Sequence, residues 1–171
     1  MLIELSKLKG LPVGIMDEAR KGGEVSRAIF DFSQIKVIGL LIQSAGIWGR
    51  EKVVALDDVV AVDSGGVVIR SEDDILEREE IVRVDKILKK KTKLIGLRAY
   101  NKEGGFLGYI YDGVIDVQVG DLMRVYVKFL WRKYIFGRSQ IIKLNEKKVV
   151  FDTNAKISEG IETVSRVAET A

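Results

Sequence analysis

Short apolar runs, separated by glycine-containing or charged turns, recur along most of the chain. In the first half such runs occupy residues 24–33, 36–44 and 51–56, and they are rich in valine and isoleucine. Their length and β-branched content are typical of strands rather than helices. Two further runs flank a Ser-Gly-Gly turn at 64–66, which predicts a hairpin. The pattern therefore predicts a β domain over residues 1–70.

A second series of apolar runs follows in residues 94–153. Residues 106–117 predict a strand, and the turn at 119–121 leads into residues 122–136, which predict either a long bent strand or a pair of strands. Shorter runs at 140–144 and 149–151 complete the series. We expect a second β domain with boundaries at about 94 and 153.

The connecting segment, residues 71–93, has a different, highly charged composition. Ser71 and Asp74 have the spacing of a capping box, and the acidic residues between them suit a helix N-terminus, so a helix is predicted over about 72–80. Residues 81–84 alternate as a strand does, and the lysine-rich stretch 89–93 predicts a solvated linker. The segment is expected to be a charged helical connector.

The last segment, residues 154–171, carries apolar residues at helical spacing. These are Ile157, Ile161, Val164, Val167 and Ala168. The spacing predicts an amphipathic C-terminal helix. Such a short helix docks on the body, pairs with a partner or frays, and docking with partial fraying is the expectation.

The turns of the two halves recur at a similar interval, which indicates a duplicated domain. Gly22 and Gly23 precede Gly104 and Gly105 by about eighty residues, and the turn at Gly39 precedes that at 119–121 by a similar interval. Few residues are identical between the halves, so the order of turns carries the comparison.

The second half also contains a characteristic series of apolar, glycine and acidic positions. The series consists of Leu94, Ile95, Gly96, Leu107, Gly108, Ile110, Asp112, Asp116 and Gly120. The first half shares its opening, residues 8–13, and the turn at Gly39, but Ser26 and Phe30 depart from the pattern.

Both series resemble the PRC-barrel family, which includes a domain of the photosynthetic reaction-centre H subunit and the C-terminal domain of a ribosome maturation factor. The resemblance implies a mainly β fold of two tandem small PRC-barrel-like β-barrels, mostly antiparallel, with a short connecting helix and a C-terminal helix. Known members mostly bind other proteins or take part in assembly, so the resemblance implies a non-enzymatic role.

The composition restricts the chemistry that the chain could perform. Cysteine and histidine are both absent, which excludes disulfides, thiolate nucleophiles, Cys/His zinc sites and catalysis that relies on histidine. The glycines at 104, 105 and 108 lack the lysine and hydroxyl residue of a phosphate loop. Asp112 and Asp116 would lie about 13 Å apart on a strand, too far for one ion. We therefore expect no enzyme activity, no metal and no cofactor.

The hydropathy of the chain bounds its location. No apolar run reaches the roughly 18 residues of a membrane span. Residues 1–5 lack a basic region followed by an apolar stretch, so no signal peptide is expected. The expectation is a cytoplasmic protein with no membrane span.

The net charge of +3 is modest, but residues 94–153 hold an excess of basic side chains and most of the aromatic ones. Residues 128–138 interleave the two types, and a loop near residue 48 holds another tryptophan. If 128–138 were a single strand, Lys128, Leu130, Arg132 and Tyr134 would share one face. The candidate interaction surface comprises Trp48, Lys128, Trp131, Arg132, Lys133, Tyr134 and Arg138.

Three interpretations of this surface remain open. It could contact another protein, it could bind RNA through stacked bases and neutralised phosphates, or it could be structural only. We expect a protein-interaction or assembly module, with an RNA- or ribosome-associated factor as the alternative and a small-ligand binder as a weaker third hypothesis. An oligomer is compatible with all three.

Overall fold

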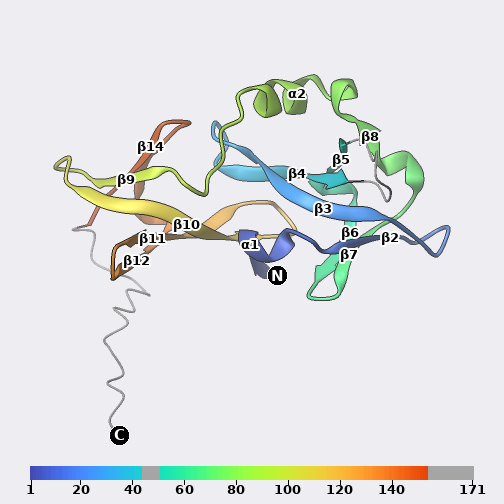
Figure 1. The fold of residues 1–171 in the computed structure, drawn as a ribbon, viewed down its shortest axis with the longest axis horizontal. Coiled ribbons are helices and arrows are strands. Elements are labelled where there is room, and N and C mark those ends of the chain that lie inside the picture. The colour runs from blue at the N-terminus through green and yellow to red at the C-terminus, as the bar shows by residue number, and fades with distance from the viewer. Residues whose placement is uncertain (44–50, 154–171) are drawn as a thin grey trace, which may run out of the picture.

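The computed structural model describes residues 1–43 and 51–153, and in this range the protein is mainly β (Figure 1). Two seven-stranded sheets contain all of the described strands, and one of them curls into a half-barrel. In the described residues, no helix combines the length and the apolar character needed to cross a membrane.

The first sheet has the strand order β6-β7-β2-β3-β4-β5-β8. Its strands are β2 (Pro12–Ile15), β3 (Arg20–Asp31), β4 (Lys36–Gln43), β5 (Glu51–Ala55), β6 (Val59–Asp63), β7 (Gly66–Ile69) and β8 (Leu76–Glu77). The 3-10 helix η1 (Leu56–Asp58) joins β5 to β6. Neighbouring strands are antiparallel, except that β2 and β7 are parallel.

The second sheet has the order β12-β11-β10-β9-β14-β13. Its strands are β9 (Arg98–Asn101), β10 (Phe106–Asp116), β11 (Leu122–Phe129), β12 (Arg132–Gly137), β13 (Ile141–Leu144) and β14 (Lys148–Phe151), and β1 (Leu2–Glu4) pairs with β10. The 3-10 helix η4 (Arg138–Gln140) joins β12 to β13. Strands β9 and β14 are the parallel pair.

The two sheets correspond strand by strand, including their bulges. Both pairs of central strands, β3–β4 and β10–β11, have two register shifts at matching positions. The outer pairs β2–β3 and β9–β10 also share a shift, just beyond Val13 and Ala99. In these pairs Val13 faces Gly23 and Ala99 faces Gly108, so Gly108, and not Gly104 or Gly105, occupies the position of Gly23.

The sheets meet at their central turns through two reciprocal backbone hydrogen bonds. Val37 N donates to Gly120 O at 2.8 Å, and Leu122 N donates to Ile35 O at 3.4 Å. Val37 and Leu122 stand at matching positions of β4 and β11, so each sheet offers the same turn to the other. This arrangement is that of an isologous contact, in which one patch binds its own copy.

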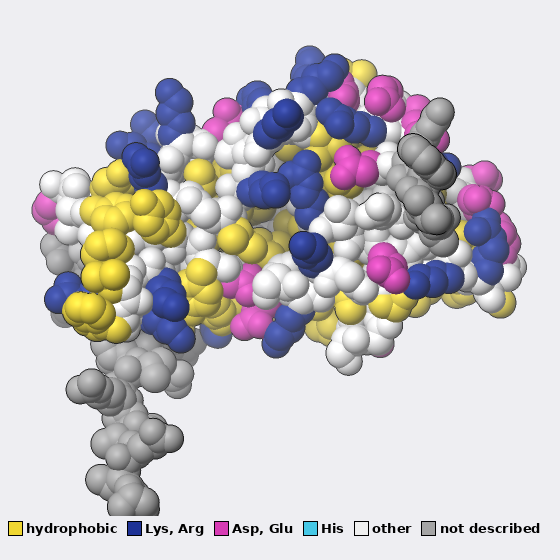
Figure 2. All heavy atoms as spheres, in the orientation of Figure 1, with side chains coloured by type: hydrophobic (Ala, Val, Ile, Leu, Met, Phe, Trp, Pro, Cys, Tyr) yellow, Lys and Arg dark blue, Asp and Glu magenta, His cyan; other side chains and the backbone are white. Residues whose placement is uncertain are grey.

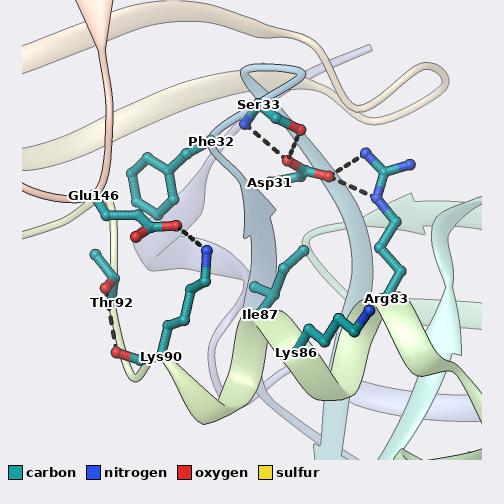
Figure 3. A pocket seen from close by; sticks show the side chains of 9 residues that line it. All are labelled: Asp31, Phe32, Ser33, Arg83, Lys86, Ile87, Lys90, Thr92 and Glu146. Carbon is teal, nitrogen blue, oxygen red and sulfur yellow. Dashed lines mark hydrogen bonds and ion pairs between the residues drawn. The ribbon is translucent and has the colours of Figure 1, made fainter.

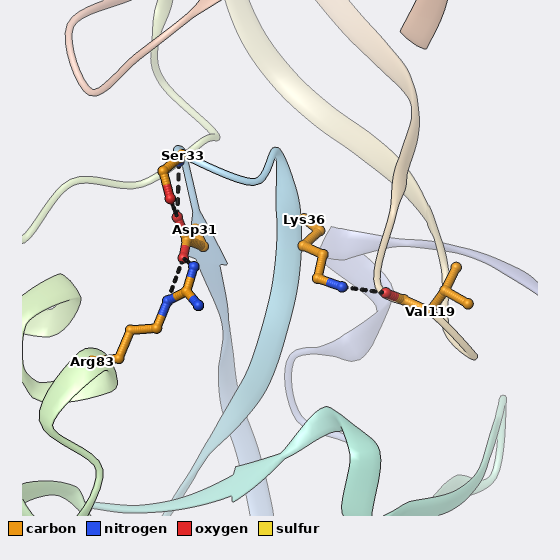
Figure 4. Close-up of polar contacts among 5 residues, drawn as sticks. All are labelled: Asp31, Ser33, Lys36, Arg83 and Val119. Atoms are coloured by element: carbon orange, nitrogen blue, oxygen red, sulfur yellow. Dashed lines mark hydrogen bonds and ion pairs between the residues drawn. The ribbon is translucent and has the colours of Figure 1, made fainter.

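Two side chains reinforce this junction. Lys36 Nζ donates to Val119 O at 3.4 Å (Figure 4). Arg138 Nη1 donates to Ile35 O at 2.8 Å. Both bonds join residues of different sheets, and a single buried core includes residues of both sheets, from Val13 to Phe151.

Helix α2 (Val82–Lys89) covers the outer face of the first sheet. Its buried residues Val84 and Leu88 form a second cluster with Ile29, Leu41 and Val53. Because Val84 and Leu88 are four residues apart, they lie on one side of the helix. A shorter helix, α1 (Leu5–Leu8), packs against β10.

The helix predicted over 72–80 is wrong. These residues form the 3-10 helices η2 (Glu72–Asp74) and η3 (Arg78–Glu80) on either side of β8. The capping box is confirmed, since Ser71 N donates to Asp74 Oδ2 at 2.9 Å. The α-helix lies over Val82–Lys89 instead, where an alternating strand and a linker were predicted. The helical conformation is favoured because it places Val84 and Leu88 on one side, where both are buried against the first sheet.

Two further predictions are refined by the pairing. The apolar run that starts at residue 94 becomes a strand only at Arg98. Residues 122–136 form a strand pair, because β11 turns at Leu130 and Trp131 into antiparallel β12. The first and last strands of each order are not paired with one another in the described residues, and the two closed barrels therefore stay a prediction. The helix predicted over 154–171 lies outside the described residues.

Candidate binding surface on the second sheet

A row of basic residues crosses five strands of the second sheet. Directly paired positions run from β12 through β11, β10 and β9 to β14. The residues at these positions are Lys133, Lys128, Tyr109, Arg98 and Lys148. Directly opposite residues share one face of a sheet, and five strands span about 19 Å. We call this set the basic row.

The charges of the basic row are not neutralised within the described part of the chain. None of its four cations forms an ion pair there, whereas eleven such pairs exist elsewhere. Lys148 Nζ lies 5.6 Å from the centroid of the Tyr100 ring, and this cation–π contact does not neutralise the charge of Lys148. Lys128 faces Lys133 directly, and like charges in that position destabilise a sheet. The row thus presents concentrated positive charge to an external group.

An aromatic cluster lies beside the basic row. The Phe106 ring is 5.5 Å from Tyr100, 5.4 Å from Tyr109 and 5.3 Å from Phe129, between ring centroids. Phe106, Tyr109 and Phe129 are exposed. Figure 2 shows a hydrophobic patch at this end of the molecule, with Lys and Arg side chains around it.

The turn between β11 and β12 extends the apolar surface. Trp131 is 83% exposed and Leu130 is 61% exposed. Leu130 has a φ of +52°, a conformation that is uncommon for a residue with a branched side chain. A large aromatic side chain held in water at a tight turn is typical of a contact site for a partner.

The structure separates the residues of the predicted surface. Lys128 and Lys133 belong to the basic row, and Arg132 faces Phe129 beside the exposed Trp131. Tyr134 packs against the core and stacks on Phe136 at 6.1 Å.

The predicted common face of Lys128, Leu130, Arg132 and Tyr134 is wrong, because the chain reverses at Leu130 and Trp131. Arg138 binds the backbone of the first sheet instead of pointing to the row. Trp48 lies outside the described residues.

Three residues of the row could not be found from local sequence. Arg98, Tyr109 and Lys148 stand on three different strands, and only the pairing of β10, β9 and β14 brings them together. No spacing within one segment signals this arrangement. The excess of basic and aromatic residues over 94–153 was the one available indication.

The first sheet offers an internal comparison. Its matching row on β5, β4, β3 and β2 consists of Glu51, Gln43, Glu24 and Pro12. That row contains two acids and no cation, although strand order and register are the same. The positive charge is therefore a property of these side chains and not of the backbone arrangement.

A small pocket lies between α2 and two turns, one from each sheet (Figure 3). Its volume is about 190 Å³, below the range of about 300–1,000 Å³ that is common for ligand pockets. Arg83 of α2 pairs with Asp31, and Lys90 Nζ pairs with Glu146 Oε1 at 2.6 Å. The two pairs attach the helix and its C-terminal end to different sheets, which indicates a structural role.

Asp31 is a buried carboxylate at the end of β3. Burial raises its pKa, but hydrogen bonds from Ser33 Oγ and Ser33 N, together with Arg83, outweigh burial and hold the pKa below its usual value (Figure 4). The carboxylate is therefore charged near neutral pH and keeps Arg83 in place.

The described residues contain no group of three or more acidic side chains that could hold a metal ion. No protein-family model matches the chain, and a search of curated proteins finds no match either. The surface of the second sheet is therefore the feature from which a function can be inferred.

Proposed function

We propose that the chain is a non-enzymatic protein-interaction module that binds an acidic partner protein through the outer face of its second sheet. The observation that carries the proposal is the basic row: a tyrosine and four cations that form no ion pair within the described residues, at directly paired positions across five strands. Complementary charge speeds encounter with an acidic partner and disfavours basic ones.

The apolar residues beside the row supply the remaining part of a protein interface. Protein interfaces combine aromatic anchors and arginine at the centre with a polar rim, and a few aromatic side chains provide most of the affinity. The aromatic cluster and Trp131 fit the anchors, and Lys128, Arg132 and Lys133 fit the rim. We therefore place the partner across the cluster, the turn and the basic row.

Duplication of a PRC-barrel-like domain is part of the same proposal. It is supported by the matching strand orders, the matching bulges and the reciprocal junction. One copy keeps an outer face that is covered by α2, and the other presents cations and aromatic residues. In this account the first copy supports the fold and the second copy binds.

A specific observation favours RNA as the second candidate partner. Tyr109 stands in the middle of the basic row, with two cations on each side. Sheets that bind single-stranded RNA stack bases on exposed aromatic rings while cations meet the phosphates. The salt dependence of binding separates this candidate from a protein partner.

The test is the double variant Lys128→Gln/Lys133→Gln. The protein partner is captured with the full chain and purified, and its affinity is then measured for the wild type and for the variants. We expect the double variant to bind about five- to tenfold more weakly, because two interfacial cations are lost. The matched control is Lys9→Gln/Lys93→Gln, which removes the same charge from two other exposed lysines and should bind as the wild type does.

Two outcomes would contradict the proposal. One is a double variant that binds the captured protein no more weakly than the control. The other is tight binding of a single-stranded RNA oligonucleotide, with a log–log salt slope that falls by about 1.4 in the double variant, as expected when two phosphate contacts of a single strand are lost. The second result would replace the protein partner with RNA.

A further inference from the structure

The outer edge of β12 is an unpaired strand edge. Among the described residues β12 pairs with β11 alone, and it ends the strand order of the second sheet. Unpaired edges carry free N–H and C=O groups that can pair with another strand. In the matching strand of the first sheet, β5, part of this edge is covered, because β8 pairs with Lys52 and Val53.

We propose that the β12 edge receives an extended acidic segment of the partner protein as an added strand, in the place that β8 takes beside β5. This inference rests on the proposed protein-binding function and names its mode. Strand addition supplies affinity through main-chain hydrogen bonds and specificity through alternate side chains. The first sheet shows that this edge position can hold a short strand.

The register of β8 indicates what an added strand would meet. Leu76 faces Val53, and Glu77 faces Lys52 and pairs with it at 3.5 Å. Lys133 faces Lys128 just as Glu51 faces Gln43, so Lys133 and Glu51 stand at matching positions. Ile135 and Val53 each lie two residues further along their strands and therefore also match. An added strand would therefore place an apolar residue opposite Ile135, which is half-buried.

The charge requirement follows from the next position on the same face. Lys133, a member of the basic row, lies two residues before Ile135 on β12. The corresponding residue of β5 is Glu51, an acid. An added strand with an apolar residue opposite Ile135 would place its residue two positions further along opposite Lys133, and that residue is expected to be Asp or Glu.

A second copy of this chain is a poorer occupant of the edge. Lysine and other charged residues on edge strands discourage pairing between identical chains. Pairing of two β12 edges would add the positive charges of two copies of Arg132 and Lys133 to one sheet, whereas an acidic segment neutralises them. The charge of the edge thus selects an acidic partner.

The test uses an eight-residue peptide with the sequence of residues 71–78 and the change Arg78→Asp. Its leucine can face Ile135 while its new aspartate faces Lys133. The peptide is titrated to millimolar concentration into the full chain, and backbone amide shifts are followed by NMR. We expect shifts at residues 133–136 and none in β5. The control peptide adds Leu76→Pro, which keeps the charge but cannot form the ladder, and should leave β12 unchanged.

A charge exchange makes the register testable. The wild-type chain should bind the Arg78→Asp peptide about three- to fivefold more tightly than the natural 71–78 peptide, the size of one cross-strand ion pair. In the Lys133→Glu variant this order should reverse. Shifts confined to Arg98 and Lys148, displacement of β8 from β5, or equal binding of the proline peptide would each overturn the proposal.

Strand addition by a partner would also be contradicted if the chain itself already occupied the β12 edge. Residues 154–171 or a second copy would then protect the β12 amides from hydrogen exchange before any peptide is added. Failure here is separable from failure of the proposed function. If Lys128→Gln/Lys133→Gln weakens binding of the captured protein while the peptide leaves β12 unchanged, the surface stands and strand addition does not.

Discussion

Replacing Gly120 with alanine is expected to lower the free energy of unfolding by about 3 kcal/mol or more, a large effect for one methyl group. Gly120 has a φ of +78°, and a Cβ there would lie 2.1 Å from Val37 O and 2.8 Å from Leu56 Cδ2. Its own carbonyl accepts the hydrogen bond from Val37 N that joins the sheets. The methyl group can be accommodated only if the junction opens, so both sheets lose their shared contact.

The matched control is Gly104→Ala. Gly104 also has a positive φ, +88°, but a Cβ there would meet no atom within 4 Å. Only the backbone strain remains, which costs about 1–2 kcal/mol. Urea unfolding followed by circular dichroism measures both variants. Equal losses for the two would show that the junction at Gly120 is not a tight contact between the sheets.

Leu88→Ala is expected to lower the free energy of unfolding by about 3 kcal/mol, within the usual range for a buried leucine. Leu88 is buried in the cluster between α2 and the first sheet, against Leu41 and Val53. Truncation leaves a cavity in a cluster of few residues, so much of the apolar contact between the helix and the sheet is lost.

The control for this variant is Val82→Ala in the first turn of the same helix. Val82 is 64% exposed, so its truncation should change stability by less than about 0.5 kcal/mol. Hydrogen exchange adds a local measurement, because α2 amides should lose protection in Leu88→Ala before those of β4 do. If Leu88→Ala has the small effect expected of Val82→Ala, the outer face of the first sheet does not depend on α2.

The sequence predicted most strands because short β-branched runs between turns carry a local signal. Residues 36–43 of the run predicted over 36–44 form β4, residues 51–56 form β5 and the start of η1, and the turn at 64–66 joins β6 to β7. Helix α2 was not predicted, because the local sequence pattern of its residues does not favour a helix. The residues Ile81 to Val84 alternate as a strand does, and only packing on the first sheet decides for a helix.

The candidate site was predicted in part for the same reason. Lys128 and Lys133 lie near each other in sequence, and the basic and aromatic character of that segment was visible. Arg98 and Lys148 join them only through the order of five strands, which no local pattern encodes. A single-strand interpretation also placed Tyr134 with Lys128, whereas the turn at Leu130 and Trp131 directs Tyr134 into the core.

We expect the second sheet, and not the first, to carry the binding surface. Hydrogen exchange of the full chain, alone and bound to its captured and purified protein partner, distinguishes the two sheets. We expect increased protection in β9 to β12, including the amides beside Tyr109, Lys128 and Lys133, and no change in the matching row of Glu24, Gln43 and Glu51. Protection centred on that first-sheet row or on α2, with β10 to β12 unchanged, would contradict it.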